Sequence, residues 1–148
     1  YKLICIKSTV PVGVGTGFVK MLAHAGVDHD LYDIVSNPEF LREGSAIHDF
    51  FHPDRIIIGT ESERARGIMK EIYAPLIESN IPCLFTDLTS SETIKYASNA
   101  FLATKLSFIN EIANLCDKSG ADIQDVAYGM GLDKRIGPHF LKPGPGFG

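Results

Sequence analysis

The chain has 148 residues, of which 45% are hydrophobic and 22% are charged, as in an ordinary globular protein. Its net charge of -4 argues against a nucleic-acid surface, and no apolar run approaches the ~18 residues that a membrane span requires. The three cysteines are odd in number and far apart in the sequence. They predict no disulfide framework, and we expect buried thiols in a reduced, cytoplasmic protein.

Short apolar runs alternate with helical patterns over the first 88 residues. The predicted strands are 2–9, 31–36, 54–60 and 81–87, and the predicted helices are about 13–26 and 62–78. This alternation indicates an α/β fold with a doubly wound parallel sheet, covered by helices on both faces. Ligands of such sheets bind beyond the carboxyl ends of the strands. Those ends are Ser8-Thr9, Ser36-Asn37, Gly59-Thr60 and Thr86-Asp87.

The pattern changes after Asp87. A capping box from Thr89 to Glu92 opens a helix of about 28 residues, which Gly120 ends, and a shorter helix follows at about 122–130. The first of these is far longer than the cover of a sheet requires, so we expect a connector or an oligomer interface. We therefore predict an α/β domain over 1–88 and an all-α domain over 89–148.

Two local motifs suggest binding sites, but simpler interpretations are favoured. GVGTG (13–17) follows a strand and opens a helix, yet it lacks the third glycine of GxGxxG, and no acidic residue ends the next strand. We interpret it as a plain strand-to-helix turn. His48 and His52 could face one side of a helix as metal ligands, but Pro53 follows and no further ligand is evident, so we expect no metal.

Two features are better candidates for chemistry. Lys95 and Asn99 lie four residues apart on the long helix, so they project from one face, where a lysine can act as acid or base and an amide can orient a hydroxyl. An exposed polar helix face is the alternative. The connection 37–55 is longer than ~12 residues, and such loops are usually functional. Within it, Glu39 and Glu43 could divide acid and base roles, whereas Arg42 could form a surface salt bridge.

Four segments carry a resemblance to a known family. They are KSTVPVG (7–13), NPEFLREGSAIHDFFHPDRIIIG (37–59), ETIKYASNAFLATKLSFINEIANLCDKSGAD (92–122) and RIGPHFLKPGPGFG (135–148). Through them the chain resembles the UDP-glucose/GDP-mannose dehydrogenase family, and most of all its members that act on UDP-glucose. The resemblance implies oxidation of a nucleotide-sugar alcohol to a carboxylate (UDP-glucuronate) with two NAD, through a cysteine-linked thiohemiacetal and thioester. It also implies a homodimer formed through the central helices.

The resemblance further implies roles for individual residues. Thr9 would position water beside the nicotinamide, Glu39 would assist thioester hydrolysis, and Lys95 and Asn99 would contact the oxidised sugar carbon. Arg135 would reach the substrate of a neighbouring subunit. The expected cofactor contacts are Ser8, Thr9, Val10 and Glu43. The expected substrate contacts are Glu39, Phe40, Leu41, Arg42, Glu43, Lys95, Asn99, Arg135, Phe140, Leu141, Lys142, Gly146, Phe147 and Gly148.

In the resembling family a GxGxxG motif precedes these segments and the catalytic cysteine follows the glycine-rich tail. We therefore expect the C-terminal half of a doubly wound, Rossmann-like sheet and the long-helix central domain of a longer enzyme, inactive by itself. Three alternatives stay open. They are a GDP-mannose or UDP-N-acetyl-sugar specificity, a single hydride transfer like that of 3-hydroxyacid dehydrogenases, and a non-catalytic dimerisation module.

Overall fold

The computed structural model describes residues 1–146, and the chain forms two compact units, Tyr1–Tyr96 and Ala97–Gly148. The first unit contains a sheet with helices, and the second is helical. The boundary between the two units falls within a long helix, after Tyr96, whereas the sequence pattern predicts a domain boundary at residue 88. None of the helices in the described residues is both long enough and apolar enough to span a membrane.

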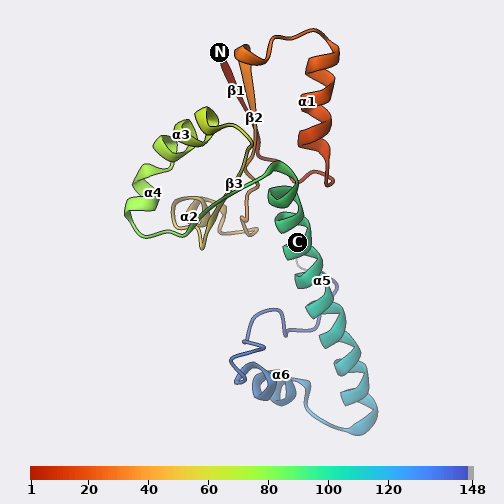
Figure 1. Cartoon of the computed structure of the whole chain (residues 1–148). Coiled ribbons are helices and arrows are strands. Elements are labelled where there is room, and N and C mark those ends of the chain that lie inside the picture. The colour runs from red at the N-terminus through yellow and green to blue at the C-terminus, as the bar shows by residue number, and fades with distance from the viewer. Residues whose placement is uncertain (147–148) are drawn as a thin grey trace. The chain divides into compact units, whose positions relative to one another are not determined.

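Four strands form one sheet in the first unit, in the order β1-β2-β3-β4 (Figure 1). They are β1 (Lys2–Ile6), β2 (Tyr32–Ser36), β3 (Ile56–Gly59) and β4 (Cys83–Thr86). Each lies within a predicted strand and is shorter than predicted. β1 pairs with β2 in parallel, and β3 pairs with β4 in parallel.

The expectation of an all-parallel sheet is wrong at the centre of the sheet. β2 and β3 run antiparallel and share a single residue pair, Ser36 with Gly59. A parallel connection usually contains a helix packed on the sheet. The chain between β2 and β3 contains only α2 (Ala46–Phe51), a helix of six residues, and it returns from the opposite direction. Because Ser36 and Gly59 each end a strand, the carboxyl ends of β2 and β3 still meet.

Helices cover both faces of the sheet, as the sequence predicts (Figure 1). The covering helices are α1 (Val14–His24), α3 (Glu63–Ile72) and α4 (Ala74–Glu78). Side chains of α1 pack on Tyr32 and Ile34 of β2, while side chains of α3 and α4 pack in the cluster that contains Val35. Because successive residues of a strand point to opposite faces, β2 contributes to both cores.

The helix predicted over 62–78 is interrupted. α3 ends at Ile72 and α4 begins at Ala74, with Tyr73 between them. Pro75 has no N–H group, and in a continuous helix its ring would collide with the carbonyl group of Glu71. Two short elements were not predicted, α2 and the 3₁₀ turn η1 (His29–Leu31).

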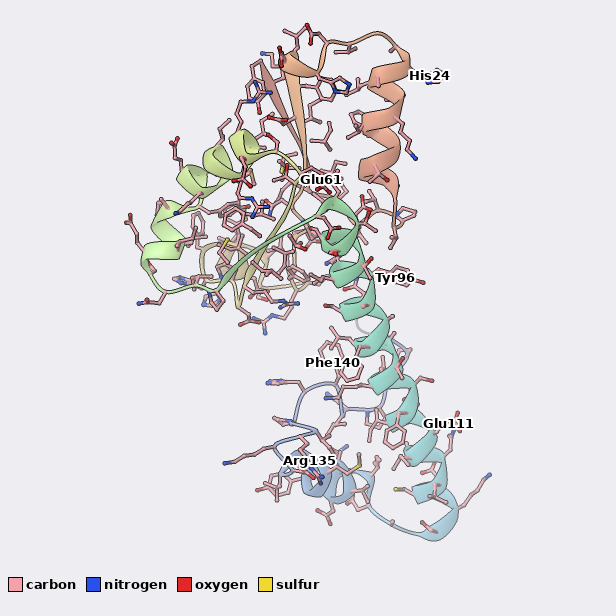
Figure 2. The ribbon with its side chains drawn as sticks, in the orientation of Figure 1. His24, Glu61, Tyr96, Glu111, Arg135 and Phe140 are labelled. Atoms are coloured by element: carbon pink, nitrogen blue, oxygen red, sulfur yellow. The ribbon has the colours of Figure 1, made fainter. Side chains whose placement is uncertain are left out.

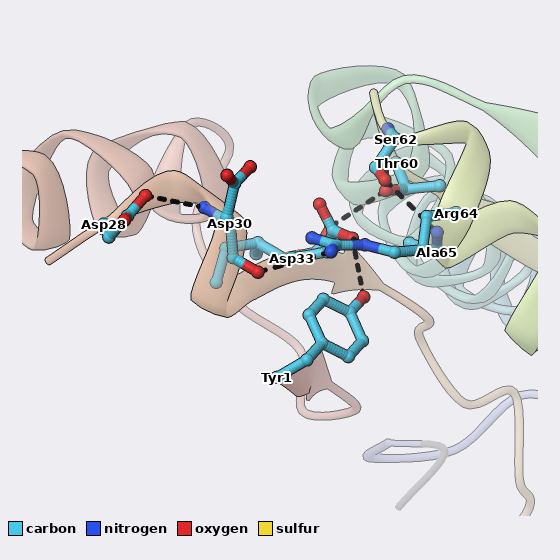
Figure 3. Close-up of polar contacts among 9 residues, drawn as sticks. Tyr1, Asp28, Asp30, Asp33, Thr60, Ser62, Arg64 and Ala65 are labelled. Carbon is cyan, nitrogen blue, oxygen red and sulfur yellow. Dashed lines mark hydrogen bonds and ion pairs between the residues drawn. The ribbon is translucent and has the colours of Figure 1, made fainter.

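Asp33 links β2 to the start of the chain and to α3 (Figure 3). Its carboxylate accepts hydrogen bonds from the Tyr1 hydroxyl at 2.5 Å and from Arg64 Nε at 2.9 Å. Burial alone would raise the pKa of Asp33, but the hydrogen bonds from Tyr1 and Arg64 outweigh burial and lower that pKa. This network stabilises the end of β2 away from the carboxyl ends of the strands.

The long predicted helix is α5 (Leu88–Ser119), which has 32 residues. The predicted capping box at its start is wrong. Asp87 accepts the Ser90 N–H at 2.7 Å, and the Glu92 carboxylate accepts the N–H groups of Gly13 and Gly15, each at 2.6 Å. A partner from α1 therefore replaces the local one that sequence spacing predicts for Glu92.

The second unit has a core of its own, formed by α5, α6 (Ile123–Gly131) and the segment that follows α6. Leu106, Ile109 and Leu141 are buried there. Partly buried around them are Ile112, Ile123, Ala127 and Met130. Gly120 follows the end of α5 with a φ of 77°, in agreement with its predicted role as a helix stop.

The expectation of three buried cysteines holds only for Cys116, which lies in α5. Cys83 is half-buried, and the expectation is wrong for Cys5, which is exposed. Cys5 lies on β1, at one end of the strand order, where one edge is not covered by another strand of residues 1–146.

Candidate active site

A buried lysine and a carboxylate lie together in the first unit. Lys95, on α5, is 6% exposed, and its Nζ lies 3.3 Å from Glu39 Oε1. The same ammonium donates a hydrogen bond to the Glu39 backbone carbonyl. The other carboxylate oxygen of Glu39 accepts the Leu41 N–H at 2.7 Å. A buried charge requires such partners, so this pair is a defined feature of the fold and not a solvated helix face.

The ring of Phe40 completes the surroundings of Lys95. The Nζ atom of Lys95 lies 5.0 Å from the ring centroid, and Cζ of Arg55 lies 3.9 Å from it. Both distances are within the range of cation–π attraction. Phe40 therefore offers its aromatic surface to the only buried lysine of the described residues.

The first turn of α5 determines where Lys95 lies. Ser91, one turn before Lys95, donates its hydroxyl to the Ser36 carbonyl at 3.1 Å and accepts the Ser36 hydroxyl at 3.0 Å. A Cβ atom at Gly59 would lie 2.5 Å from Ser91 Cβ and 2.6 Å from the Asp87 carbonyl oxygen, so only glycine fits. The helix is thus pressed against the carboxyl ends of β2 and β3.

Asn37 anchors the start of the loop that carries Glu39, two residues before that glutamate. It is buried, and its side-chain amide donates to the Ile57 carbonyl at 2.8 Å. Its Oδ1 accepts from Lys7 Nζ at 3.0 Å and from the Tyr73 hydroxyl at 2.5 Å. These bonds connect the start of the loop to β1, β3 and the α3–α4 junction.

Arg42 is engaged by Asp49 in a tight local network. The buried Asp49 carboxylate accepts from the backbone N–H, Nε and Nη2 of Arg42, at 2.9, 2.9 and 2.6 Å, and from the Ser45 hydroxyl at 3.0 Å. The Arg42 guanidinium is the main cause that holds the pKa of Asp49 far below its usual value. The salt bridge considered for Arg42 is present, and its predicted substrate contact stays a prediction.

One pocket of the first unit joins four consecutive predicted residues. It is lined by residues 39–42 together with Asn37, Arg55 and Tyr73, among others. Glu43 and Leu41 are exposed, as are Ser8 and Thr9 directly after β1. The structure therefore brings Glu39, Phe40 and Lys95 into contact. The other predicted residues of this unit are exposed, except Val10, which is half-buried.

The turn before α1 does not fit a pyrophosphate. A phosphate at a helix N-terminus needs free backbone N–H groups. Those of Gly13 and Gly15 are bonded to Glu92, so the interpretation of GVGTG as a structural turn is supported. The cofactor contact expected for Ser8 and Thr9, which are exposed, stays a prediction.

In the second unit most of the predicted substrate residues follow α6 in the chain. Arg135 is exposed and bonded to Asp133, and Figure 2 shows it with Phe140 on the segment that follows α6. Phe140 has a φ of 62°, a strained value for an aromatic residue. The Leu141 side chain is buried in the core, so a contact to substrate could come only from its backbone.

The remaining predicted residues of this unit are distributed along its chain. Asn99 is half-buried on α5, whereas Lys142 and Gly146 are exposed. Phe147 and Gly148 lie outside the described residues.

Asn110 holds the glycine-rich segment onto α5. Its Nδ2 donates to the Gly144 carbonyl at 2.9 Å, and its Oδ1 accepts the Gly144 N–H at 2.9 Å. The side chain thus replaces a backbone partner for one residue of the tail. Within residues 1–146, no group of three or more histidine, cysteine or acidic residues could hold a metal ion.

Two family descriptions match the chain. The NAD binding domain of the UDP-glucose/GDP-mannose dehydrogenase family matches residues 1–77, and the central domain of the same family matches residues 89–148. The chain belongs to the UDP-glucose/GDP-mannose dehydrogenase family. Members of this dehydrogenase family use NAD, and the match over residues 1–77 is to the domain that binds it.

Similar proteins of this family cover almost the whole chain. UDP-glucose 6-dehydrogenase from Rickettsia typhi is 53% identical over 99% of this chain, and the one from Rhizobium meliloti is 53% identical over 100%. UDP-glucose 6-dehydrogenase YwqF from Bacillus subtilis is 54% identical over 99%. The chain covers 33%, 34% and 32% of these proteins, so it spans about a third of the length of the curated relatives it matches.

Solved structures of the family have the same fold. A UDP-glucose dehydrogenase from Pyrobaculum islandicum has a TM-score of 0.88 and 44% identity, over 96% of this chain and 32% of that one. A GDP-mannose dehydrogenase from Pseudomonas aeruginosa has a TM-score of 0.75 and 30% identity, over 96% and 33%. The predicted Rossmann-like α/β fold with a long central helix is confirmed.

Four residues of the site were missed by sequence reasoning. They are Asn37, Asp49, Glu92 and Asn110. Asn37 stood at a predicted strand end before a proline, which is a usable signal. Asp49 lies in a connection for which no helix is predicted, Glu92 is predicted to close a capping box, and Asn110 lies within the pattern of the long helix. No local signal marks the partner that any of them has in the structure.

Proposed function

We propose that this chain forms part of an NAD-dependent UDP-glucose 6-dehydrogenase, which oxidises UDP-glucose to UDP-glucuronate with two NAD. The observation that carries the proposal is the identity of 53% to 54%, over 99% or more of the chain, to proteins named UDP-glucose 6-dehydrogenase. The Glu39–Lys95 pair supplies the chemical groups that such a reaction needs.

The two side chains have different proposed tasks. When the sugar alcohol loses a hydride to NAD, negative charge develops on its oxygen, and the Lys95 ammonium can stabilise that charge. Glu39, whose side chain is 35% exposed and 3.3 Å from Lys95, can accept a proton from the water that hydrolyses the thioester. We further propose that Thr9 positions this water and that Asn99 orients the reacting hydroxyl.

The thiol nucleophile is not assigned to any cysteine of this sequence. Cys116 is 3% exposed within α5, and burial raises the pKa of both Cys5 on β1 and Cys83 on β4. A reactive cysteine needs exposure and a depressed pKa. We therefore assign the nucleophile to a part of the full-length protein outside these 148 residues.

We propose that the second unit contributes to nucleotide binding and to a homodimer. The segment 140–148 would bind the uridine and diphosphate, and Arg135 would reach the substrate of a neighbouring subunit. Phe101, Phe108 and Leu115 recur every seven residues on α5 and are 65%, 49% and 59% exposed. Such a stripe on a long helix is suited to packing against a second copy of itself. The three unpaired cysteines favour a cytoplasmic location.

The proposal is tested by product stoichiometry in the full-length protein. We expect two NADH for each UDP-glucose consumed, and UDP-glucuronate as the product by mass spectrometry. One NADH for each substrate would support a single hydride transfer, as in 3-hydroxyacid dehydrogenases. GDP-mannose and UDP-N-acetyl sugars serve as competitor substrates, and a lower KM for either would overturn the assignment to UDP-glucose.

A further inference from the structure

Glu92 is the most deeply buried charged residue among those that the structure describes, at 2% exposure. Both of its carboxylate oxygens are used, Oε2 by the Gly13 N–H and Oε1 by the Gly15 N–H, each at 2.6 Å. Within residues 1–146, no lysine, arginine or histidine lies within ion-pair distance of it. The negative charge is therefore stabilised by backbone donors at the N-terminus of α1, where the helix dipole is positive.

The glycines of the turn are adapted to this contact. Gly13 precedes α1 with a φ of 96°, which a residue with a side chain rarely adopts. A Cβ atom at Gly15 would lie 3.0 Å from Glu92 Oε1 and 3.3 Å from Leu88 Cδ2. The turn and the first turns of α5 therefore approach each other closely, and the carboxylate is the polar link between them.

The contact joins two segments whose relative position matters for the proposed reaction, the Ser8–Val10 segment and the part of α5 that carries Lys95. Gly13 follows the Ser8–Val10 segment after only two residues, one of them Pro11, whose ring restricts the backbone. On the other side, Lys95 lies three residues after Glu92 and so on the same side of α5. A shift of the turn would move Thr9 relative to Lys95.

We propose that Glu92 is a positioning residue for the cofactor: it fixes the segment that contacts NAD relative to the helix that carries Lys95. This inference rests on the proposed function, because it assumes that Ser8–Val10 contacts NAD. Glu92 itself touches neither reactant. Its carboxylate occupies the N–H groups of the turn and holds the turn at one distance from α5.

The first test compares Glu92→Gln with Ser91→Ala in the full-length protein. The introduced amide can accept only one of the two N–H groups, and its own NH₂ group would face the other. We expect the KM for NAD to rise about tenfold and the KM for UDP-glucose to stay within about twofold. Ser91→Ala removes buried hydrogen bonds from the same turn of α5 without touching Gly13 or Gly15, so it should destabilise the fold without this selective rise. Equal effects of the two variants on both KM values would overturn the proposal.

A second variant approaches the same contact from the opposite side. Gly15→Ala places a methyl group against Glu92 Oε1 and should reproduce the selective rise in KM for NAD. Because both changes act on one contact, the double variant should be no worse than the stronger single variant. Additive effects would show that the two residues act independently and would contradict the proposal.

Amide hydrogen exchange gives a readout that does not depend on activity. Glu92→Gln should accelerate exchange at Gly13 and Gly15, whereas Ser91→Ala should leave both amides protected. Unchanged protection in Glu92→Gln would overturn the inference. If the unaltered protein forms no NADH with UDP-glucose, the proposed function fails by itself, and the exchange measurement still decides whether Glu92 holds the turn.

Discussion

The two units of this chain differ in where they keep charged side chains. In the first unit, Asp49, Glu92 and Lys95 are at most 6% exposed, and all three are hydrogen-bonded. In the described part of the second unit, every buried residue is apolar or a cysteine. The ion pair of Arg135 with Asp133 lies at the surface there.

The difference agrees with the proposal that the first unit carries the reacting side chains and the second unit supports them. Burial of a charge is unfavourable unless hydrogen bonds or an opposite charge offset it, and each of these three charges has such partners. The second unit packs a core and holds the glycine-rich segment through one asparagine. Substitution of Lys95 in the first unit should therefore change turnover, whereas substitutions in the second unit should change assembly or substrate affinity.

The largest expected effect is that of Lys95→Ala in the full-length protein. Without the ammonium group, we expect kcat with UDP-glucose to fall by about 10² to 10⁴. The control is Lys118→Ala, which removes an exposed lysine near the end of the same helix and should leave turnover unchanged. Circular dichroism checks that both variants fold. A folded Lys95→Ala protein with unchanged kcat would break the distinction between the two units.

Phe108→Glu should change assembly. A carboxylate in the exposed stripe of Phe101, Phe108 and Leu115 would be desolvated in the proposed dimer, so we expect light scattering to report dimers for the unaltered protein and monomers for the variant. Asp117→Ala, nine residues further and therefore on the opposite side of α5, should not alter the mass. A Phe108→Glu protein that stays dimeric would assign the interface to another surface.

Asn110→Ala should loosen the glycine-rich segment. Loss of both hydrogen bonds to Gly144 should lower the free energy of unfolding by about 1 to 3 kcal/mol and raise the KM for UDP-glucose more than it lowers kcat. Asn114→Ala, one turn along α5 and exposed, is the matched control. A fall in kcat alone would contradict a supporting role for the second unit.

The smallest effect at neutral pH is expected for Asp49→Asn. The pKa of Asp49 is lower in the folded than in the unfolded protein. Its carboxylate therefore stabilises the fold fully above the unfolded pKa of about 3.9. This stabilisation is lost as the pH falls through the pKa of Asp49 in the folded protein. The variant should have a lower thermal midpoint at pH 7 and a shallower decline of that midpoint below about pH 4.

Asp54→Asn, on the same connection and exposed, should keep the steep decline. Some pH dependence will persist in Asp49→Asn, because the pKa values of Asp33, Asp87 and Asp133 are also lowered. Identical acid profiles for Asp49→Asn and the unaltered protein would show that the Arg42–Asp49 contact does not stabilise the fold.

The sequence by itself determined the strands, the long helix and the segments that carry the site. Hydrophobic periodicity and helix stops are local signals, which is why β1 to β4, α5 and the Gly120 stop were predicted near their observed positions. The same locality explains the errors. A short apolar run does not record the direction of β3, and a capping-box spacing does not record that Glu92 accepts from Gly13 and Gly15 at the start of α1.

Only the tertiary structure decided which polar groups meet. Glu39 and Lys95 are 56 residues apart, Gly13 and Glu92 are 79 apart, and Asn110 and Gly144 are 34 apart. Each contact forms because the folded chain brings the two groups together where packing limits their access to water, so their polar atoms bond to one another. That requirement depends on every element that surrounds the group, and no short stretch of sequence contains it.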